Sequence, residues 1–279
     1  MDKYKTARVL KEFLIHVFLF AVAVTCIFPL FWMVRSALMT KETIFVDKSL
    51  IPRVIDLSNF SKAWIAGNFG TYFINSVFYT VVVVVSIVVI ASLAAYAFSR
   101  LKFPGRNIFF YMFVLAMMIP LPGGFVSLVV LVNKLGLVNT RIGYVLCMIN
   151  VSLSVSILLM KTFFDKMPSD LEDAARIDGC GNLGVWWHVA MPLARPAIAV
   201  VVIFNALTVW NEFILANLLL SDDRLMTLQT GLYKFQGPHL ADYPMLMAGL
   251  TISAVPIIIV YLFMQKYIIK GLSLGDIVG

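Results

Sequence analysis

The sequence carries little charge for its length. Lysine, arginine, aspartate and glutamate make up 13% of the 279 residues, which is about half of the ~25% that is usual in soluble proteins. Apolar residues make up 61% of the chain, and the mean hydropathy is +0.93. So few polar side chains neither cover a soluble domain of this size nor keep a chain disordered. The composition therefore predicts an integral membrane protein with several spans.

Cysteine is scarce as well. The three cysteines, Cys26, Cys147 and Cys180, are widely separated, and two of them lie in apolar stretches. This spacing excludes a disulfide framework and a zinc site. The cysteines are therefore interpreted as small apolar side chains.

Enzyme motifs are also missing. No Gly-Lys pair occurs, which excludes a phosphate-binding P-loop, and none of the three histidines belongs to an HExxH pattern. Residues 179–184 fit GxGxxG, but they follow a charged amphipathic stretch instead of a strand, so a dinucleotide site is not expected. We expect no catalytic residue, no metal site and no cofactor bound by this chain.

Long apolar stretches are what the sequence does have. Each is long enough for a helix that crosses ~30 Å of hydrocarbon, which takes ~20 residues. In lipid the backbone must bond within its own segment, so the stretches are predicted to be helices. The expected fold is an all-α integral membrane protein with six transmembrane helices in a single domain over residues 1–279. The six predicted spans are 13–34, 72–99, 107–132, 142–160, 197–220 and 245–264.

The distribution of basic residues predicts the orientation. The short turn from Arg100 to Arg106 has three basic residues and no acid, and the N-terminal tail, the loop 161–196 and the C-terminal tail are basic too. Basic loops stay on the cytoplasmic side. Both termini and the loop 161–196 are therefore predicted to be cytoplasmic, and the loop 35–71, with a short helix near 60–66, is predicted to lie outside.

The third predicted span contains helix-disrupting residues. Pro120, Pro122, Gly123 and Gly124 stand in its middle. Proline removes a backbone donor and kinks a helix. The kink is interpreted either as a hinge or pathway wall, or as a bend fitted to a neighbouring helix.

Glu212 is the only charged residue inside the six stretches. An acid near the bilayer centre costs ~2.5–3.5 kcal/mol on insertion scales, so Glu212 should face protein or water. Asn205, Trp210 and Asn211 accompany it, and aromatic, amide and acid groups are what sugar sites use. Together with Asn75 they form a candidate substrate pathway. The alternative is that Glu212 makes a structural bond to a neighbouring helix or to a partner subunit.

The loop 161–196 is polar and patterned. Ser169 and Glu172 are spaced as a capping box, which predicts the start of a short helix. Small and apolar side chains follow at helical spacing, and Gly179 is predicted to end the helix in left-handed geometry. A second short stretch, 185–189, is expected to close at Pro192. The first helix is interpreted either as a docking element for a partner or as a helix packed beneath its own bundle.

The residues of this loop carry a family resemblance. Asp173-Ala174-Ala175, then Gly179, then Val189-Ala190-Met191-Pro192 resembles the EAA motif of ABC-importer permeases, E-A-A-x3-G-x9-I-x-L-P. The spacing matches throughout, and Asp, Val and Met replace Glu, Ile and Leu. Further stretches resemble the carbohydrate branch of that family, the maltose-type inner permease subunit. They are Asn75-Ser76, residues 94–100, residues 118–120, Leu135-Gly136-Leu137, residues 210–213 and Lys270-Gly271-Leu272.

The resemblance implies a type I ABC importer in a bacterial-type cell membrane. Two permease subunits would form the pore, two separate ATPase subunits would bind ATP and magnesium, and an extracytoplasmic sugar-binding protein would deliver the cargo. Lipid is the remaining partner, and nucleic acid is not expected. The residues implied for coupling to the ATPase are Glu172, Asp173, Ala174, Ala175, Asp178, Gly179, Met191 and Pro192.

Two rival functions stay open at this point. The same importer could carry another cargo, such as glycerol phosphate, a peptide or an amino acid. The chain could instead be part of a secondary transporter, a class that is typically built from inverted repeats. No clear repeat is visible, and that class leaves the patterned loop 161–196 without an explanation.

The predicted topology is testable by cysteine labelling in intact cells. Ser58→Cys should react with a membrane-impermeant reagent added outside, because the loop 35–71 is expected to lie there. Ser169→Cys should react only after the membrane is opened. Labelling of Ser58→Cys exclusively from the inside would contradict the orientation.

Overall fold

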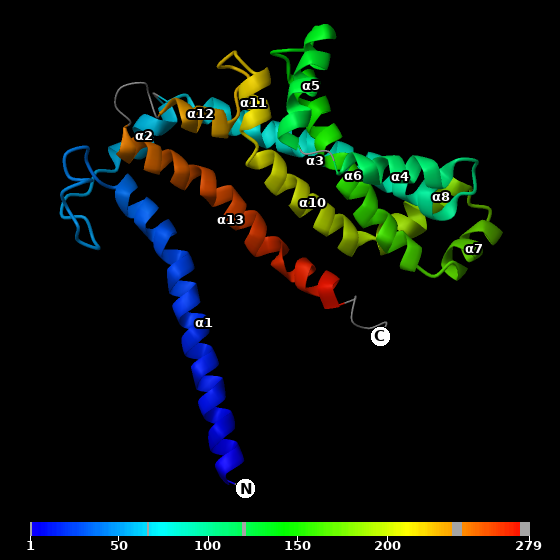
Figure 1. Cartoon of the computed structure of the whole chain (residues 1–279), viewed down its shortest axis with the longest axis horizontal. Coiled ribbons are helices and arrows are strands. Elements are labelled where there is room, and N and C mark those ends of the chain that lie inside the picture. The colour runs from blue at the N-terminus through cyan, green and yellow to red at the C-terminus, as the bar shows by residue number, and fades with distance from the viewer. Residues whose placement is uncertain (1, 66, 119–120, 236–241, 274–279) are drawn as a thin grey trace. The chain divides into compact units, whose positions relative to one another are not determined.

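The computed structural model describes residues 2–65, 67–118, 121–235 and 242–273. These residues form helices joined by turns and loops, with no strand among them (Figure 1). The helices are α1 (Asp2–Ala37), α2 (Ser58–Ile65), α3 (Phe69–Arg100), α4 (Arg106–Ala116), α5 (Leu121–Lys134), α6 (Arg141–Lys166), α7 (Asp170–Ile177), α8 (Asn182–Val185), the π-helix η1 (Trp186–Ala190), α9 (Met191–Leu193), α10 (Arg195–Trp210), α11 (Ile214–Leu219), α12 (Leu228–Lys234) and α13 (Tyr243–Ser273). The all-α prediction is confirmed.

Four helices of the described residues are long and apolar enough to cross a membrane. They are Val9–Ala37, Phe69–Arg100, Arg141–Lys166 and Tyr243–Phe263, and they coincide with four of the six predicted spans. A fifth crossing is obtained if the bent pair Asn182–Leu193 and Arg195–Trp210 counts as one span. The structure therefore gives four or five candidate spans, where six were predicted.

The third predicted span differs from a single helix. Helix α4 ends at Ala116, and α5 starts at Leu121 and runs in another direction (Figure 1). Pro120 lies outside the described residues. Pro122 falls in the first turn of α5, where a proline is tolerated because the first backbone N–H groups of a helix have no partner within it. A kink was predicted within 107–132, and the described residues form two separate helices in that range.

The chain divides into two compact units. One contains Met1–Phe69 and Leu232–Ala254, and the other contains Gly70–Gly231 and Val255–Gly279. In the first unit, the segment between α1 and α2 folds back on the end of α1. Arg35, almost fully buried, donates from Nε to the carbonyl of Ser49 (2.7 Å) and from Nη2 to the carbonyl of Asp47 (2.7 Å). Its guanidinium also lies over the ring of Trp32, 4.4 Å from the centroid.

The carboxylate of Asp47 organises the same segment. It accepts hydrogen bonds from the Ser49 hydroxyl (2.5 Å), from the Ser49 backbone N–H and from the Arg53 backbone N–H. These donors stabilise the ionised form and lower the pKa of Asp47 to about 2. The predicted short helix that follows is confirmed as α2. Ala66, the last residue of that prediction, lies outside the described residues.

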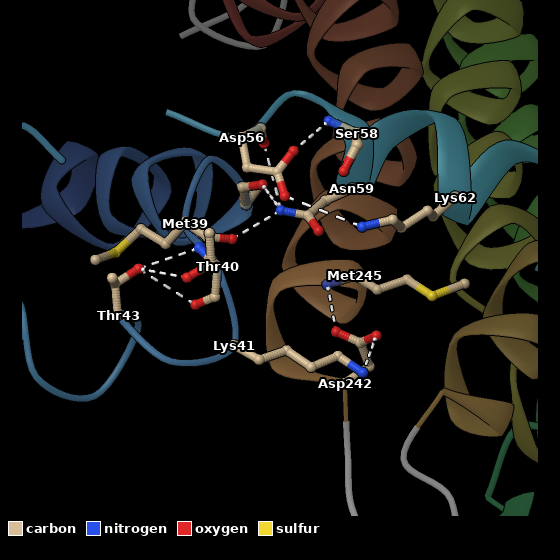
Figure 2. Close-up of polar contacts among 11 residues, drawn as sticks. Met39, Thr40, Lys41, Thr43, Asp56, Ser58, Asn59, Lys62, Asp242 and Met245 are labelled. Atoms are coloured by element: carbon tan, nitrogen blue, oxygen red, sulfur yellow. Dashed lines mark hydrogen bonds and ion pairs between the residues drawn. The ribbon is translucent and has the colours of Figure 1, made fainter. Parts of the chain in front are cut away.

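Asn59 joins α2 to the end of α1. Its buried amide donates to the carbonyl oxygen of Met39 (2.8 Å), as Figure 2 shows, and to that of Ala37 (2.9 Å). Lys41 forms an ion pair with Asp242 (2.9 Å), whose carboxylate also accepts the backbone N–H of Met245 in the first turn of α13 (Figure 2). Side-chain bonds thus connect three segments of this unit that are distant in sequence.

The second unit has the larger core, built from α3 and α6 with the helices that pack on them. Its aromatic and aliphatic side chains include Tyr79 and Tyr144, whose rings meet edge to face with centroids 4.8 Å apart. Apolar stretches that are β-branched, such as 81–85, are nevertheless helical. Length and the hydrocarbon environment outweigh their weak preference for strands.

Loss of the Asn59 amide should loosen the first unit. Asn59→Ala leaves the buried carbonyls of Ala37 and Met39 without this donor, and an unsatisfied buried polar group costs about 1–3 kcal/mol. We expect a lower melting temperature of the detergent-purified protein and faster proteolysis within residues 38–57. Ser61→Ala, an exposed change on the same helix, is the control. Equal melting temperatures for the two variants would contradict the anchoring role.

Candidate functional site

The start of α7 differs from its prediction. Ser169 precedes the helix in a helical conformation (φ −71°, ψ −26°), and its side chain makes no capping hydrogen bond. The predicted capping box is therefore wrong. Because Ser169 is helical, its backbone carbonyl accepts the N–H of Glu172 (2.9 Å), which leaves its hydroxyl without that role. The Glu172 side chain lies at Arg100 instead, with Oε1 2.7 Å from Nε.

The end of α7 agrees with its prediction. Gly179 has φ +87°, and the N–H of Cys180 donates to the carbonyl of Ala175 (3.0 Å). Left-handed geometry at this position is the usual way to close a helix and is accessible to glycine without strain. A Cβ placed on Gly179 would meet nothing within 4 Å, so the turn faces open space.

Exposure divides the predicted coupling residues of α7 into two groups. Glu172 is 2% exposed, and Ala175 is half-buried against the core of the second unit. The opposite side is open: the Asp173 side chain is 63% exposed and Ile177 is 87% exposed. Ala174, Asp178 and Gly179 are exposed with them. The exposed part of α7 and its closing turn thus combines small residues with acidic side chains and the apolar side chains of Leu171 and Ile177.

The chain is helical from Asn182 to Leu193. Val185, Trp186 and Ala190 are buried, Met191 is half-buried and Pro192 is exposed. Pro192 stands in the first turn of α9 and does not close the segment, contrary to prediction. The chain instead bends by 78° between Asn182–Leu193 and Arg195–Trp210. This bend lies at Ala194, which is buried.

The fifth predicted span is interrupted at Glu212. Helix α10 ends at Trp210 and α11 begins at Ile214, so the expectation of one helix over 197–220 is wrong. The Glu212 carboxylate accepts the backbone N–H groups of Leu215 (2.6 Å) and Ala216 (2.8 Å). An acid at a helix N-terminus satisfies N–H groups that have no partner within the helix. The Tyr144 hydroxyl on α6 donates to Glu212 Oε2 (3.4 Å).

Asn75 is buried near the start of α3 and holds a loop. Its amide donates to the carbonyls of Arg224 (2.8 Å) and Met226 (3.0 Å), and its Oδ1 accepts from Arg141 (3.1 Å). The Tyr79 hydroxyl, one turn further along α3, donates to the carbonyl of Leu225 (2.9 Å). The loop between α11 and α12 is therefore fixed to α3.

The other predicted pathway residues lie in different surroundings. Asn205 is fully buried and donates to Ser156 Oγ on α6 (2.9 Å) and to its own helix. Trp210 is buried and meets the ring of Phe73 edge to face at 5.7 Å. Asn211 is exposed at the break and donates to the carbonyl of Leu207 (2.8 Å). Of these five side chains, Asn211 and the half-buried Glu212 are the accessible ones.

Sequence reasoning did not assign Tyr96, Arg100 and Tyr144 to the site. Tyr96 and Arg100 belong to residues 94–100, which resemble the carbohydrate branch of the family. Arg100 was otherwise used only as a basic residue of the turn 100–106. Tyr144 lies within an apolar span, where a single hydroxyl gives no periodic signal. No group of three or more His, Cys, Asp or Glu side chains among the described residues could hold a metal ion.

Comparison with known proteins identifies the class. Residues 86–274 match the family of binding-protein-dependent transport system inner membrane components. The chain belongs to this family of permeases, which places it in the cell membrane with several spans.

Individual relatives cover the whole chain. It is 34% identical over 278 residues to the probable ABC transporter permease protein YurM of Bacillus subtilis, with 100% of this chain and 92% of the relative covered. It is 32% identical over 277 residues to the trehalose/maltose transport system permease protein MalG of Thermococcus litoralis, with 98% and 99% covered. A chain in the crystal structure of a bacterial ABC transporter involved in the import of the acidic polysaccharide alginate superimposes with a TM-score of 0.83 at 25% identity, covering 96% and 98%.

The role of Glu212 as a helix cap is testable by substitution. Glu212→Ala removes both acceptors of the α11 N-terminus and should cost about 1–2 kcal/mol, as other lost caps do. Glu212→Gln keeps one carbonyl acceptor and should lose less. Thermal unfolding in detergent measures both, and an equal loss for the two variants would contradict the cap.

Proposed function

We propose that this chain is the permease subunit of an ABC importer that moves a sugar or oligosaccharide into the cytoplasm. Family membership supports the transport class. The cargo class is supported by a relative named for trehalose and maltose and by the alginate importer, both of which match nearly the whole chain. Glycerol phosphate, peptide or amino-acid cargo is not favoured by these similarities.

The driving reaction in this proposal takes place in other subunits. ATP and magnesium are bound by two ATPase subunits, a second permease subunit completes the pore, and an extracytoplasmic binding protein delivers the sugar. This chain then needs a surface that receives the ATPase. The exposed side of α7 together with the open turn at Gly179 is the observation that carries this assignment.

The docking surface is proposed to comprise the exposed residues of the motif. Ala174 and Gly179 allow close approach of a partner because neither adds bulk. Asp173 and Asp178 offer charge to a basic partner side chain, and Ile177 offers apolar area. Glu172 and Ala175 face the chain's own core. Met191 and Pro192 belong to the second helical segment, which supports the first.

The proposed topology keeps six crossings and both termini in the cytoplasm. Helices α4 and α5 together would make one interrupted crossing, and α10 with α11 another. Interrupted helices are tolerated at membrane depth where protein or a water-filled cavity satisfies the free backbone groups. The capping of α11 by Glu212 is such a compensation.

The proposed substrate pathway passes the break at 211–213. Asn211 and Glu212 are the candidate sugar contacts, because both are at least partly accessible. Asn75, Asn205 and Trp210 are buried and would act as the supporting wall. Aromatic and amide groups behind an accessible acid are consistent with a path for a polar, uncharged ligand.

Docking through α7 is testable with two glycines of the same loop. Gly179→Val forces a β-branched residue into left-handed geometry, which costs roughly 1–2 kcal/mol locally, and adds bulk to the surface. Gly181→Val is the matched control, because Gly181 has φ −73° and its Cβ would also meet nothing within 4 Å. Ala174→Trp tests bulk alone on the exposed side.

Co-purification of the ATPase from membranes measures the outcome, together with uptake of labelled trehalose or maltose in proteoliposomes that contain the binding protein. We expect Gly179→Val and Ala174→Trp to lose at least about tenfold in ATPase recovery, which corresponds to ~1.4 kcal/mol, while Gly181→Val resembles wild type. Wild-type recovery of the ATPase by both test variants would overturn the docking assignment.

A further inference from the structure

Two neighbouring acids of α7 have opposite environments. The Asp173 side chain is 63% exposed, and that of Glu172 is 2% exposed. Glu172 Oε1 lies 2.7 Å from Nε of Arg100, whose side chain is itself 16% exposed. The family resemblance implies a coupling role for both acids. In the structure Glu172 is buried, so only Asp173 can reach a partner without unfolding the helix.

The second carboxylate oxygen of Glu172 is held as well. The Tyr96 hydroxyl donates to Oε2 (3.3 Å), and Arg176 Nη2 lies 3.8 Å from it. Tyr96 is buried, and its ring packs edge to face on Phe164 near the end of α6. The carboxylate is therefore fixed by two side chains from the last turns of α3.

Arg100 extends the connection to the segment before α7. Its Nη2 donates to the carbonyl of Met167, which lies between α6 and α7. Beside it, the Ser99 hydroxyl donates to Asp165 (2.6 Å), and Asp165 pairs with Lys161 (2.7 Å). The last turn of α3 thus bonds to the end of α6, to the connecting segment and to α7.

We propose that Glu172 is a positioning residue that transmits the displacement of α7 to α3, and that it does not contact the ATPase. This inference rests on the proposed function, in which α7 receives the ATPase. Attraction between charges is stronger in a buried site than in water. A helix attached only by a half-buried alanine could slide on the core, whereas the pair with Arg100 keeps the ends of α7 and α3 together.

If Glu172 only stabilised the fold, its loss would lower ATPase binding and sugar transport together. Binding of the ATPase depends on the exposed side of α7, and the use of ATP for transport depends on the link from α7 to α3. Breaking the link should therefore leave the ATPase bound and hydrolysing ATP while less sugar moves. The ratio of ATP hydrolysed to sugar transported is the specific readout.

The experiment uses the assembled complex in proteoliposomes, with binding protein and labelled trehalose or maltose, at a temperature where every variant is folded. Glu172→Gln removes the charge and keeps the size of the side chain. We expect ATPase recovery within about twofold of wild type and an ATP-to-sugar ratio raised about tenfold, inside the 5–150-fold range of typical coupling. Asp173→Asn is the matched control and should lower ATPase recovery with an unchanged ratio.

Exchanging the two charges of the Glu172–Arg100 pair provides a stricter test. The double variant Glu172→Arg with Arg100→Glu should recover part of the wild-type ratio that each single reversal loses. If the reversed pair fails to assemble, Tyr96→Phe replaces it, since this change removes one donor to Glu172 and should raise the ratio about threefold, below the usual coupling range.

Two results would overturn the inference. One is a loss of ATPase recovery by Glu172→Gln that equals or exceeds the loss by Asp173→Asn, which would make Glu172 a direct contact. The other is a wild-type ATP-to-sugar ratio in Glu172→Gln. Failure of the docking proposal is distinguishable, because Gly179→Val, Ala174→Trp and Asp173→Asn would then all retain the ATPase.

Discussion

The need to satisfy backbone polar groups away from water is the constraint on which this structure depends. It makes the apolar stretches helical, including β-branched ones, because a helix bonds its own backbone. The same constraint decides how the helices are interrupted. Where the fifth stretch breaks, the Glu212 carboxylate accepts two backbone N–H groups of α11. Where α7 ends, left-handed geometry at Gly179 lets Cys180 donate to the carbonyl of Ala175.

Buried polar side chains have a related role in joining elements distant in sequence. Asn59 bonds the end of α1 to α2 in the first unit, and Asn75 bonds α3 to the loop before α12 in the second. Both side-chain amides donate to backbone carbonyls, and such hydrogen bonds offset the cost of burying polar atoms. Arg100 and Glu172 form a buried ion pair, for which the penalty of removing one partner is larger.

The segment from Asp170 to Gly179 has two sides with different surroundings. Its exposed side consists of small, acidic and apolar residues that suit docking, and its buried side holds Glu172 and Ala175 against the chain itself. The 78° bend between Asn182–Leu193 and Arg195–Trp210 lies at the end of the loop 161–196, where the loop joins the fifth stretch.

The sequence by itself determined the class of protein, the helical fold, the position of four long spans, the short α2 helix and the closing turn at Gly179. These features follow from composition, from runs of apolar residues and from local backbone preference, which are all properties of neighbouring residues. Tertiary structure decided which of two adjacent acids is buried and which side chain meets Glu212 where the fifth stretch breaks. These depend on Arg100, Tyr96 and Tyr144, which are distant in sequence, because a side chain takes the strongest partner that the fold brings within reach.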